Sequence, residues 1–149
     1  MSIKVYSPTE GKVIPLSEVP DPVFAQEMVG PGIAIDPTRE EQTVVSPIDG
    51  TISTLKPHAM VIEDENKKAV LIHLGIDTVN LNGEGFELHA EAGDKVSKGD
   101  KLVTWNPKEI DEKGLSPVIP IIALDTQKDA IEVTDEETVE AGDSLLTIN

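Results

Sequence analysis

The stretch Ala69-Val70-Leu71-Ile72-His73-Leu74-Gly75-Ile76-Asp77-Thr78-Val79 governs the interpretation of the rest of the chain. It begins with an uninterrupted apolar run, which is typical of a strand buried on both faces. The run ends at His73, and Asp77 follows four positions later. A titratable ring at the end of a buried strand is costly unless it is solvated or used in a reaction. His58 precedes His73 by fifteen positions, so two neighbouring strands can bring both rings to one place.

Repeated motifs predict an internally duplicated β-architecture. The pattern Ser-Pro, two residues, Gly, any residue and an apolar residue occurs twice, beginning at Ser7 and at Ser46. Gly-Asp turns also recur, at Gly93-Asp94 and Gly142-Asp143. Eleven prolines and eleven glycines spread along the chain favour many short strands and few long helices. No linker or low-complexity tract interrupts the chain, so we expect residues 1–149 to form a single domain.

Local signals predict the individual elements. Asn66-Lys67 is expected to be the turn of a hairpin. A short helical turn near Val23–Met28 is expected to have Asp21 as its N-cap. A second helical piece is expected around Pro107–Lys113. Strands are expected at 33–35, 101–105, 118–124 and 145–148, the third of them broken by Pro120 or placed at a sheet edge.

Composition excludes several classes of protein. Twelve basic and 28 acidic residues give a formal net charge of −16, which argues against nucleic acid and anionic membranes as partners and favours a basic partner. No cysteine occurs, so the chain itself has no thiolate nucleophile, disulfide or cysteine metal site. No apolar run approaches the roughly 20 residues needed to span a bilayer, and no signal-peptide pattern is present. We expect a cytoplasmic protein without direct membrane insertion, whose core consists of Val, Ile and Leu.

The histidines are the candidate reactive groups. Gly75 leaves space beside the His73 ring, and Asp77 can orient or tune it electrostatically. Two imidazoles without a Cys or Ser partner suggest either a metal pair or nucleophilic phosphoryl chemistry. The third histidine, His89, is flanked by acids and is expected to be an ordinary surface residue.

The string from His73 to Phe86, HLGIDTVNLNGEGF, closely resembles the signature of the glucose-type IIA domain of the bacterial phosphoenolpyruvate-dependent sugar phosphotransferase system. Further pieces resemble the same family in the same order, from about Val5 to the end of the chain. They are Ser7-Pro8 with Gly11, Val19–Ala25, Gly32–Ile35, Ser46-Pro47 with Asp49-Gly50, and His58-Ala59. Together with the repeats, the resemblance implies an all-β fold, an internally duplicated antiparallel β-sandwich or barrel with many short strands and a few short helical turns.

The resemblance also implies a mechanism that needs no cofactor. In this family a phosphoryl group passes from the phosphohistidine of the carrier protein HPr to the IIA domain, and then to a cysteine of a IIB domain that phosphorylates the incoming sugar. His73 matches the phosphorylated histidine, and His58 matches the histidine that stabilises the transferring group. We expect the reacting nitrogen of His73 to be Nε2, with Nδ1–H held by a carbonyl near Gly75.

Acidic and apolar residues around the histidines match the docking surface of the family. The matching residues are Asp21, Val23, Phe24, Met28, Leu71, Asp77 and Val79. An apolar surface ringed by acids suits a weak, rapidly exchanging interface with a basic partner. One departure lies two residues before His58, where the family often has Thr and this chain has Lys56, a cation that alters the electrostatics beside His58.

Three alternatives stay open. The first is a zinc-dependent hydrolase using His73 and Asp77, although the His-x-His pair usual in such enzymes is missing. Even if the protein is not a zinc enzyme, His58 and His73 can bind a zinc ion that is adventitious or shared with a partner. The second is a biotinyl or lipoyl carrier, which needs a lysine at a hairpin tip, where only Asn66-Lys67-Lys68 is available. The third is a regulatory module that binds permeases or metabolic enzymes. The sugar is not encoded in this chain, because specificity belongs to the membrane partner.

Overall fold

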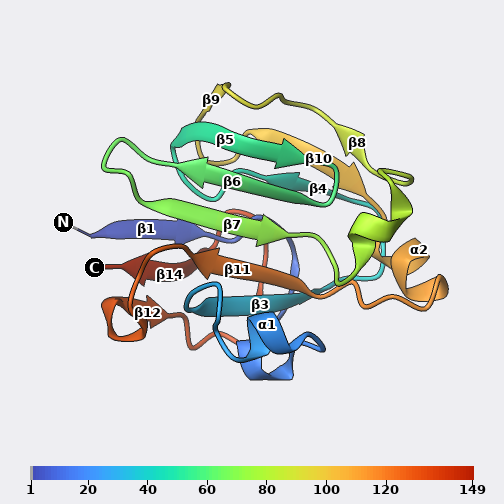
Figure 1. Ribbon diagram of the computed structural model, residues 1–149, viewed down its shortest axis with the longest axis horizontal. Helices are drawn as coiled ribbons and strands as arrows, with labels where there is room; N and C mark the ends of the chain where they lie inside the picture. Colours follow the sequence, from blue (N-terminus) through green and yellow to red (C-terminus); the bar gives the residue numbers. More distant parts are fainter. Residues whose placement is uncertain (1) are drawn as a thin grey trace.

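An eight-stranded antiparallel sheet crosses the molecule in the computed structural model, which describes residues 2–149 (Figure 1). Its strand order is β13-β2-β3-β11-β7-β6-β5-β9, and two three-stranded sheets have the orders β1-β14-β12 and β4-β10-β8. The strands are β1 Ile3–Tyr6, β2 Gly11–Ile14, β3 Gly32–Pro37, β4 Gln42–Val45, β5 Gly50–Lys56, β6 Ala59–Glu63, β7 Ala69–His73, β8 Glu87–Leu88, β9 Lys95–Val96, β10 Lys101–Trp105, β11 Ile119–Ala123, β12 Ile131–Val133, β13 Thr138–Val139 and β14 Ser144–Ile148. The helical segments are η1 Leu16–Glu18, α1 Pro22–Ala25, η2 Thr78–Leu81, α2 Pro107–Glu112 and η3 Lys128–Ala130. The predicted all-β sandwich is confirmed.

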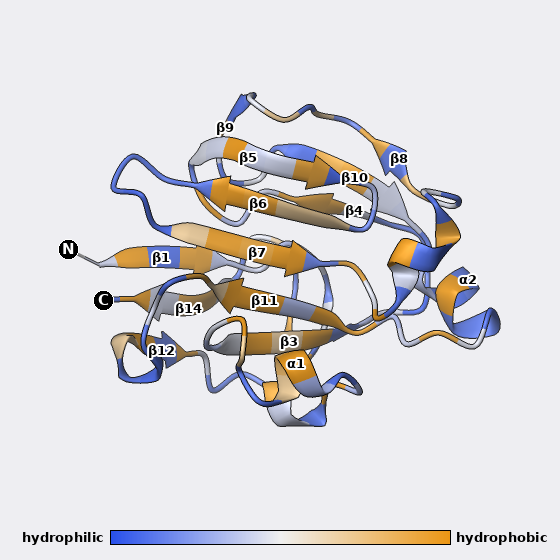
Figure 2. Ribbon diagram, in the orientation of Figure 1, coloured by the Kyte–Doolittle hydropathy of each residue, from blue (hydrophilic) through white to orange (hydrophobic). Residues whose placement is uncertain are grey.

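The core lies where the inner faces of the sheets meet. One buried cluster combines Ile52, Ile72 and Ile121 of the large sheet with residues of both small sheets, such as Leu102 and Leu145. Figure 2 shows β3, β7 and β11 largely in the hydrophobic colour, while the loop joining β6 to β7 is hydrophilic. The expectation of a core of Val, Ile and Leu is confirmed for most buried residues, since β-branched residues pack well on pleated surfaces, but Trp105 and Met60 are also fully buried in it.

The internal duplication is visible in the backbone hydrogen bonds of the two Ser-Pro motifs. The same two bonds, one donated and one accepted by the serine backbone, link Ser7 to Gly142-Asp143 and Ser46 to Gly99-Asp100. The motifs also exchange a reciprocal pair of bonds, from Tyr6 N to Pro47 O and from Val45 N to Pro8 O. The two halves are therefore joined at equivalent points.

The sequence pattern matched Gly142-Asp143 to Gly93-Asp94, but in the structure the turn equivalent to Gly142-Asp143 is Gly99-Asp100. Gly93, Gly99 and Gly142 all have φ between 91° and 96°, as a type II turn requires. Three turns therefore share one local geometry. The turn at Gly93 forms its hydrogen bonds with Ile52, whereas the turns at Gly99 and Gly142 each form theirs with the serine of a Ser-Pro motif. Local sequence identified the turn type but not the partner.

The expectation that Pro120 breaks its strand or lies at an edge is wrong. β11 is a central strand between β3 and β7, and Pro120 is buried within it. Leu124 N donates to Ala69 O of β7, and amides alternate along a strand, so the Pro120 nitrogen also faces β7. Pro120 lies level with His73, the last residue of β7, and the first residue of β11 that pairs with β7 is Ile121. The position at which Pro120 lacks a backbone N–H therefore lies beside the end of β7.

The other local expectations agree with the structure, with small shifts of boundaries. Residues 64–68 form the hairpin loop, in which Asp64 Oδ1 accepts hydrogen bonds from Asn66 N and Lys68 N. α1 is shorter than predicted, although Asp21 is its N-cap. No helix within residues 2–149 has the length and apolar character needed to cross a membrane.

The central position of Ile121 leads to a stability prediction. Ile121 is fully buried between β3 and β7, so Ile121→Ala should lower the free energy of unfolding by about 2–5 kcal/mol in urea denaturation. Val133→Ala, in the half-exposed strand β12, should change it by less than about 0.5 kcal/mol. Equal losses in the two variants would contradict the assigned core.

Candidate functional site

His73 is the last residue of β7, and its ring is held by the backbone of the residues that follow. Its Nδ1 lies 2.6 Å from the carbonyl oxygen of Gly75. Because a carbonyl oxygen can only accept, Nδ1 must carry the hydrogen. In the neutral ring the lone pair is then on Nε2, the nitrogen that a nucleophilic attack needs. The predicted carbonyl contact is confirmed.

The loop after β7 is held in place so that the Gly75 carbonyl faces the ring. Thr78 Oγ1 donates to Leu74 O at 2.7 Å, and Ile76 N donates to Ser116 O at 2.8 Å. Gly75 has φ +82°, and a Cβ there would lie 2.6 Å from Thr78 Cγ2. Glycine is therefore required both by the backbone conformation and by the lack of space.

His58 lies in the tight turn between β5 and β6 and reaches the same place. Its carbonyl oxygen accepts a hydrogen bond of 2.7 Å from Leu74 N, which extends the β6–β7 ladder by one step beyond the pair Ala59 and His73. The centroids of the two imidazole rings are 5.3 Å apart, and the rings meet edge to face at 75°. The structure thus brings together the two histidines that the sequence singled out.

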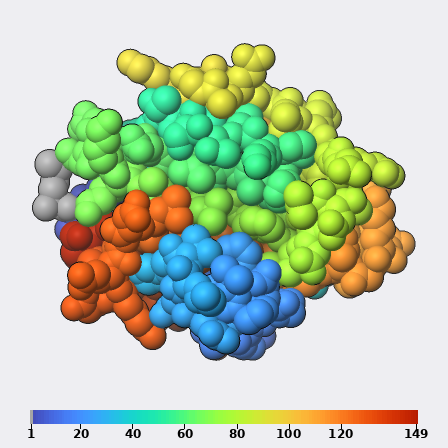
Figure 3. Space-filling model, in the orientation of Figure 1, coloured from blue at the N-terminus to red at the C-terminus, as the bar shows by residue number. Residues whose placement is uncertain are grey.

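Phe24 forms one wall of the site. The Asp21 carboxylate accepts a hydrogen bond of 2.9 Å from Val23 N and so caps α1. The buried Phe24 ring of this short helix lies 5.1 Å from the His73 ring, centroid to centroid. Figure 3 shows the segment of α1, in blue, beside the lime-green segment of η2 on one face of the molecule. His73, the last residue of β7, lies against α1.

Burial dominates the electrostatics of both rings. It lowers the pKa of His73 below the ordinary 6.5, and the Gly75 hydrogen bond and the charges of Asp21 and Asp77 only partly oppose this. Burial also lowers the pKa of His58, with further lowering from His73 and from the cation Lys56. Both rings are therefore mainly neutral near pH 7, the form in which an imidazole acts as a nucleophile.

The expected interface residues differ in exposure. Val23, Met28 and Val79 are exposed apolar residues. Asp77, with φ +62°, is an exposed acid at the start of η2. Leu71 is only half-buried and packs against the small core cluster that contains Phe24.

Sequence reasoning missed the residues that hold the loop after β7. Ser116 lies 41 positions after Gly75, and nothing in its local sequence indicates that its carbonyl binds this loop. Thr78 resembled an ordinary polar residue, although its hydroxyl is buried and bonded to Leu74. His89 is exposed, as expected, and bonds Thr104 through Nε2. Within residues 2–149 no group of three or more His, Cys, Asp or Glu side chains is placed to hold a metal ion.

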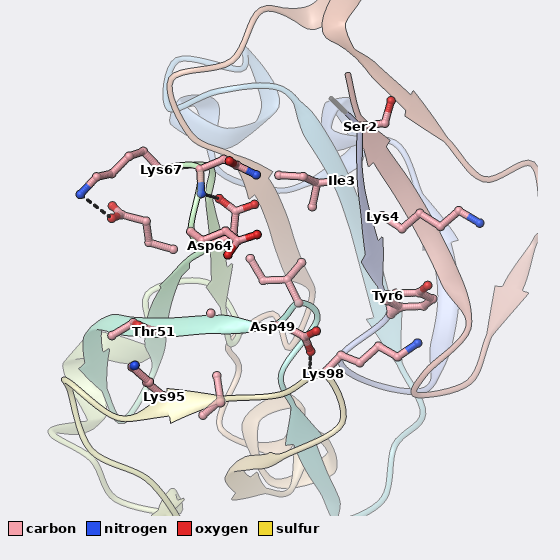
Figure 4. Close-up of a pocket in the computed structure, with 16 residues that line it drawn as sticks. Ser2, Ile3, Lys4, Tyr6, Asp49, Thr51, Asp64, Lys67, Lys95 and Lys98 are labelled. Atoms are coloured by element: carbon pink, nitrogen blue, oxygen red, sulfur yellow. Dashed lines mark hydrogen bonds and ion pairs between the residues drawn. The ribbon is translucent and has the colours of Figure 1, made fainter.

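A cleft lies at the far end of the β6–β7 hairpin, away from the two histidines (Figure 4). It has a volume of about 870 Å³ and is lined by Lys67, Lys95 and Lys98 among other residues. Lys98 lies over the Tyr6 ring at 3.8 Å, and its backbone N–H donates to Asp49. Neither histidine of the site lines this cleft.

The lowered pKa values predict a dependence of stability on pH. Between the unfolded pKa of 6.5 and the lower folded pKa, the unfolded chain binds more protons at His58 and His73, so acidification favours unfolding. The free energy of unfolding from urea denaturation should fall between about pH 7.5 and pH 5.5, above the ordinary range of carboxylates. His73→Gln should make this fall smaller, and an identical fall in the variant would contradict the burial of the ring.

Comparisons with known proteins identify the family of the chain. The family model of the phosphoenolpyruvate-dependent sugar phosphotransferase system, EIIA 1, matches residues 3–129. The glucose-specific EIIA component of Oceanobacillus iheyensis is 48% identical over 126 residues, covering 83% of this chain and 75% of that protein. The corresponding component of Staphylococcus aureus strain COL is 41% identical over 145 residues, covering 95% and 86%.

Two further relatives extend the comparison. The glucose-specific EIIBCA component of Corynebacterium glutamicum is 44% identical over 128 residues, covering 85% of this chain but 19% of that longer protein. Among solved structures, the glucose permease IIA of Mycoplasma capricolum matches with a TM-score of 0.92 and 34% identity, covering 100% of this chain and 97% of that one. The chain therefore belongs to the EIIA 1 family of the phosphoenolpyruvate-dependent sugar phosphotransferase system.

Proposed function

We propose that His73 is the residue that carries the phosphoryl group in this member of the phosphotransferase system. The observation that carries the assignment is the 2.6 Å hydrogen bond from Nδ1 to Gly75 O, which leaves the lone pair on Nε2. Nε2 attacks the phosphorus of the HPr phosphohistidine, so a new N–P bond forms while the donor's N–P bond breaks. The electron pair of the broken bond stays on the donor ring. A cysteine thiolate of a IIB domain then takes the group from His73.

His58 stabilises the group during transfer. Phosphoryl transfer passes through a loose transition state with charge on the three equatorial oxygens, so its catalysis depends on positioning and electrostatic stabilisation. The His58 ring, 5.3 Å from that of His73, lies within reach of a group bound to His73 and can donate a ring N–H to its oxygens. His58 thereby lowers the barrier without being phosphorylated.

HPr and the IIB domain dock in turn on the surface formed by Val23, Met28 and Val79 beside Asp21 and Asp77. The exposed apolar side chains supply contact area, and the acids attract a basic partner face. The net charge of −16 extends this attraction beyond the contact and accelerates encounters. Because the interface must release each partner quickly, a small apolar area with charged surroundings suits the relay.

Residues 1–149 act as one IIA domain in the cytoplasm, where HPr and the IIB domain meet it. The EIIBCA relative carries its EIIA part in the same chain as its other components, which supports direct transfer to IIB. The relatives are named glucose-specific, so glucose is the first sugar to test. In its unphosphorylated form the same surface can bind permeases or metabolic enzymes and regulate them.

The proposed roles predict different phosphorylation behaviour for substitutions of the two histidines. With phosphoenolpyruvate, enzyme I and HPr, the wild-type protein should acquire an acid-labile phosphate that maps to His73. His73→Gln should acquire none, whereas His58→Gln should be phosphorylated but transfer the group to IIB at least about tenfold more slowly, as expected when a stabilising donor is lost. Labelling of folded His73→Gln at wild-type level would refute the assignment.

The docking surface can be tested with two matched substitutions. Val79→Asp places a charge in the proposed contact, where Val79 is 54% exposed, and should raise the Kd for HPr about tenfold or more. Val133→Asp makes the same change at a residue that is 46% exposed in β12, outside the proposed surface, and should leave the Kd unchanged. Equal effects in both variants, measured by calorimetry, would place the contact elsewhere.

A further inference from the structure

We propose that Lys56 contacts the phosphoryl group on His73 and supplies the permanent positive charge of the site, an inference that rests on the proposed function of His73. The geometry of the sheet points to this role, because Lys56 and His73 lie in one row across three neighbouring strands. Lys56 pairs with Ala59 between β5 and β6, and Ala59 pairs with His73 between β6 and β7.

Directly opposed residues of an antiparallel sheet project their side chains from the same face. Two strand spacings of about 4.8 Å separate the backbones of Lys56 and His73, and the residue between them is alanine. The flexible four-carbon stem of lysine spans roughly 6 Å, enough for its ammonium group to pass over Ala59. The small methyl group of Ala59 leaves the route open.

The charges around the rings explain why a cation is needed beside the phosphoryl group. Asp21 and Asp77 both act on His73, and their carboxylates repel the oxygens of a phosphoryl group. His58, whose pKa is lowered by burial, by His73 and by Lys56, is mainly neutral and offers a hydrogen bond rather than a full charge. Lys56 is the cation whose field reaches the His58 ring, and it stays charged at neutral pH.

The ammonium group forms no covalent bond in the reaction. As the N–P bond to Nε2 of His73 forms and the donor's N–P bond breaks, the three equatorial oxygens move toward Lys56 and His58. The ammonium group neutralises part of their charge, which stabilises phosphorylated His73 relative to the donor. Lys56 is exposed, so salt weakens the contact.

The test compares Lys56→Gln, Lys56→Arg and the wild type after phosphorylation by HPr. Loss of an exposed charge contact should shift the phosphorylation equilibrium about three- to tenfold toward HPr in Lys56→Gln, and Lys56→Arg should restore most of it. The pKa of the phosphoryl group, followed by phosphorus NMR, should be higher in Lys56→Gln because a neighbouring cation lowers it. This readout would not respond to a merely structural role. The difference between variants should shrink at high salt.

Lys67→Gln is the matched control, because it removes the same charge at the other end of the β6–β7 hairpin, where Lys67 is largely exposed. It should leave both the equilibrium and the phosphoryl pKa as in the wild type. If wild-type His73 is phosphorylated but Lys56→Gln behaves like the wild type, the role of Lys56 is refuted while the proposed function stands. If wild-type His73 takes up no phosphate, the proposed function itself fails.

Discussion

The hydrogen bond from His73 Nδ1 to the Gly75 carbonyl is the constraint on which the site depends. It selects the tautomer and leaves the lone pair of the neutral ring on Nε2. The bond exists only because Gly75 adopts a left-handed conformation and because Thr78 and Ser116 hold the loop in that shape. The chemistry of one ring nitrogen is therefore determined by backbone geometry two residues away.

The pairing of β6 with β7 brings the second histidine, His58, next to His73. β6 and β7 are paired so that Ala59 lies opposite His73, and the ladder continues through the bond from Leu74 N to His58 O. A shift of register by one residue would turn His73 to the other face of the sheet. The stable core beneath these strands thus sets the distance between the rings, while the loops at their ends supply the polar partners.

The site resolves a conflict between its charges. Burial keeps both imidazoles neutral, as nucleophilic attack requires, while Asp21 and Asp77 oppose the approach of an anionic group. In the proposed function, those same acids favour the docking of a basic carrier, which brings its phosphoryl group with it. The proposed relay therefore requires this surface both to attract its partner with negative charge and to receive a negative group. In the proposed mechanism, His58 and Lys56 meet this requirement beside His73.

Sequence alone determined the strand-rich class, the duplication, the two histidines and the expected contact with Gly75, because periodicity, turn residues and a long family signature are local properties. It failed at Pro120, since the absence of a partner at the end of β7 depends on pairing between distant strands. It also assigned the wrong partner turn to Gly142, because three turns share one local chemistry. The tertiary structure alone decided that Ser116 holds the loop after β7 and that Lys56, Ala59 and His73 form one row. Strand register and long-range hydrogen bonds join residues far apart in the chain, and no local pattern encodes them.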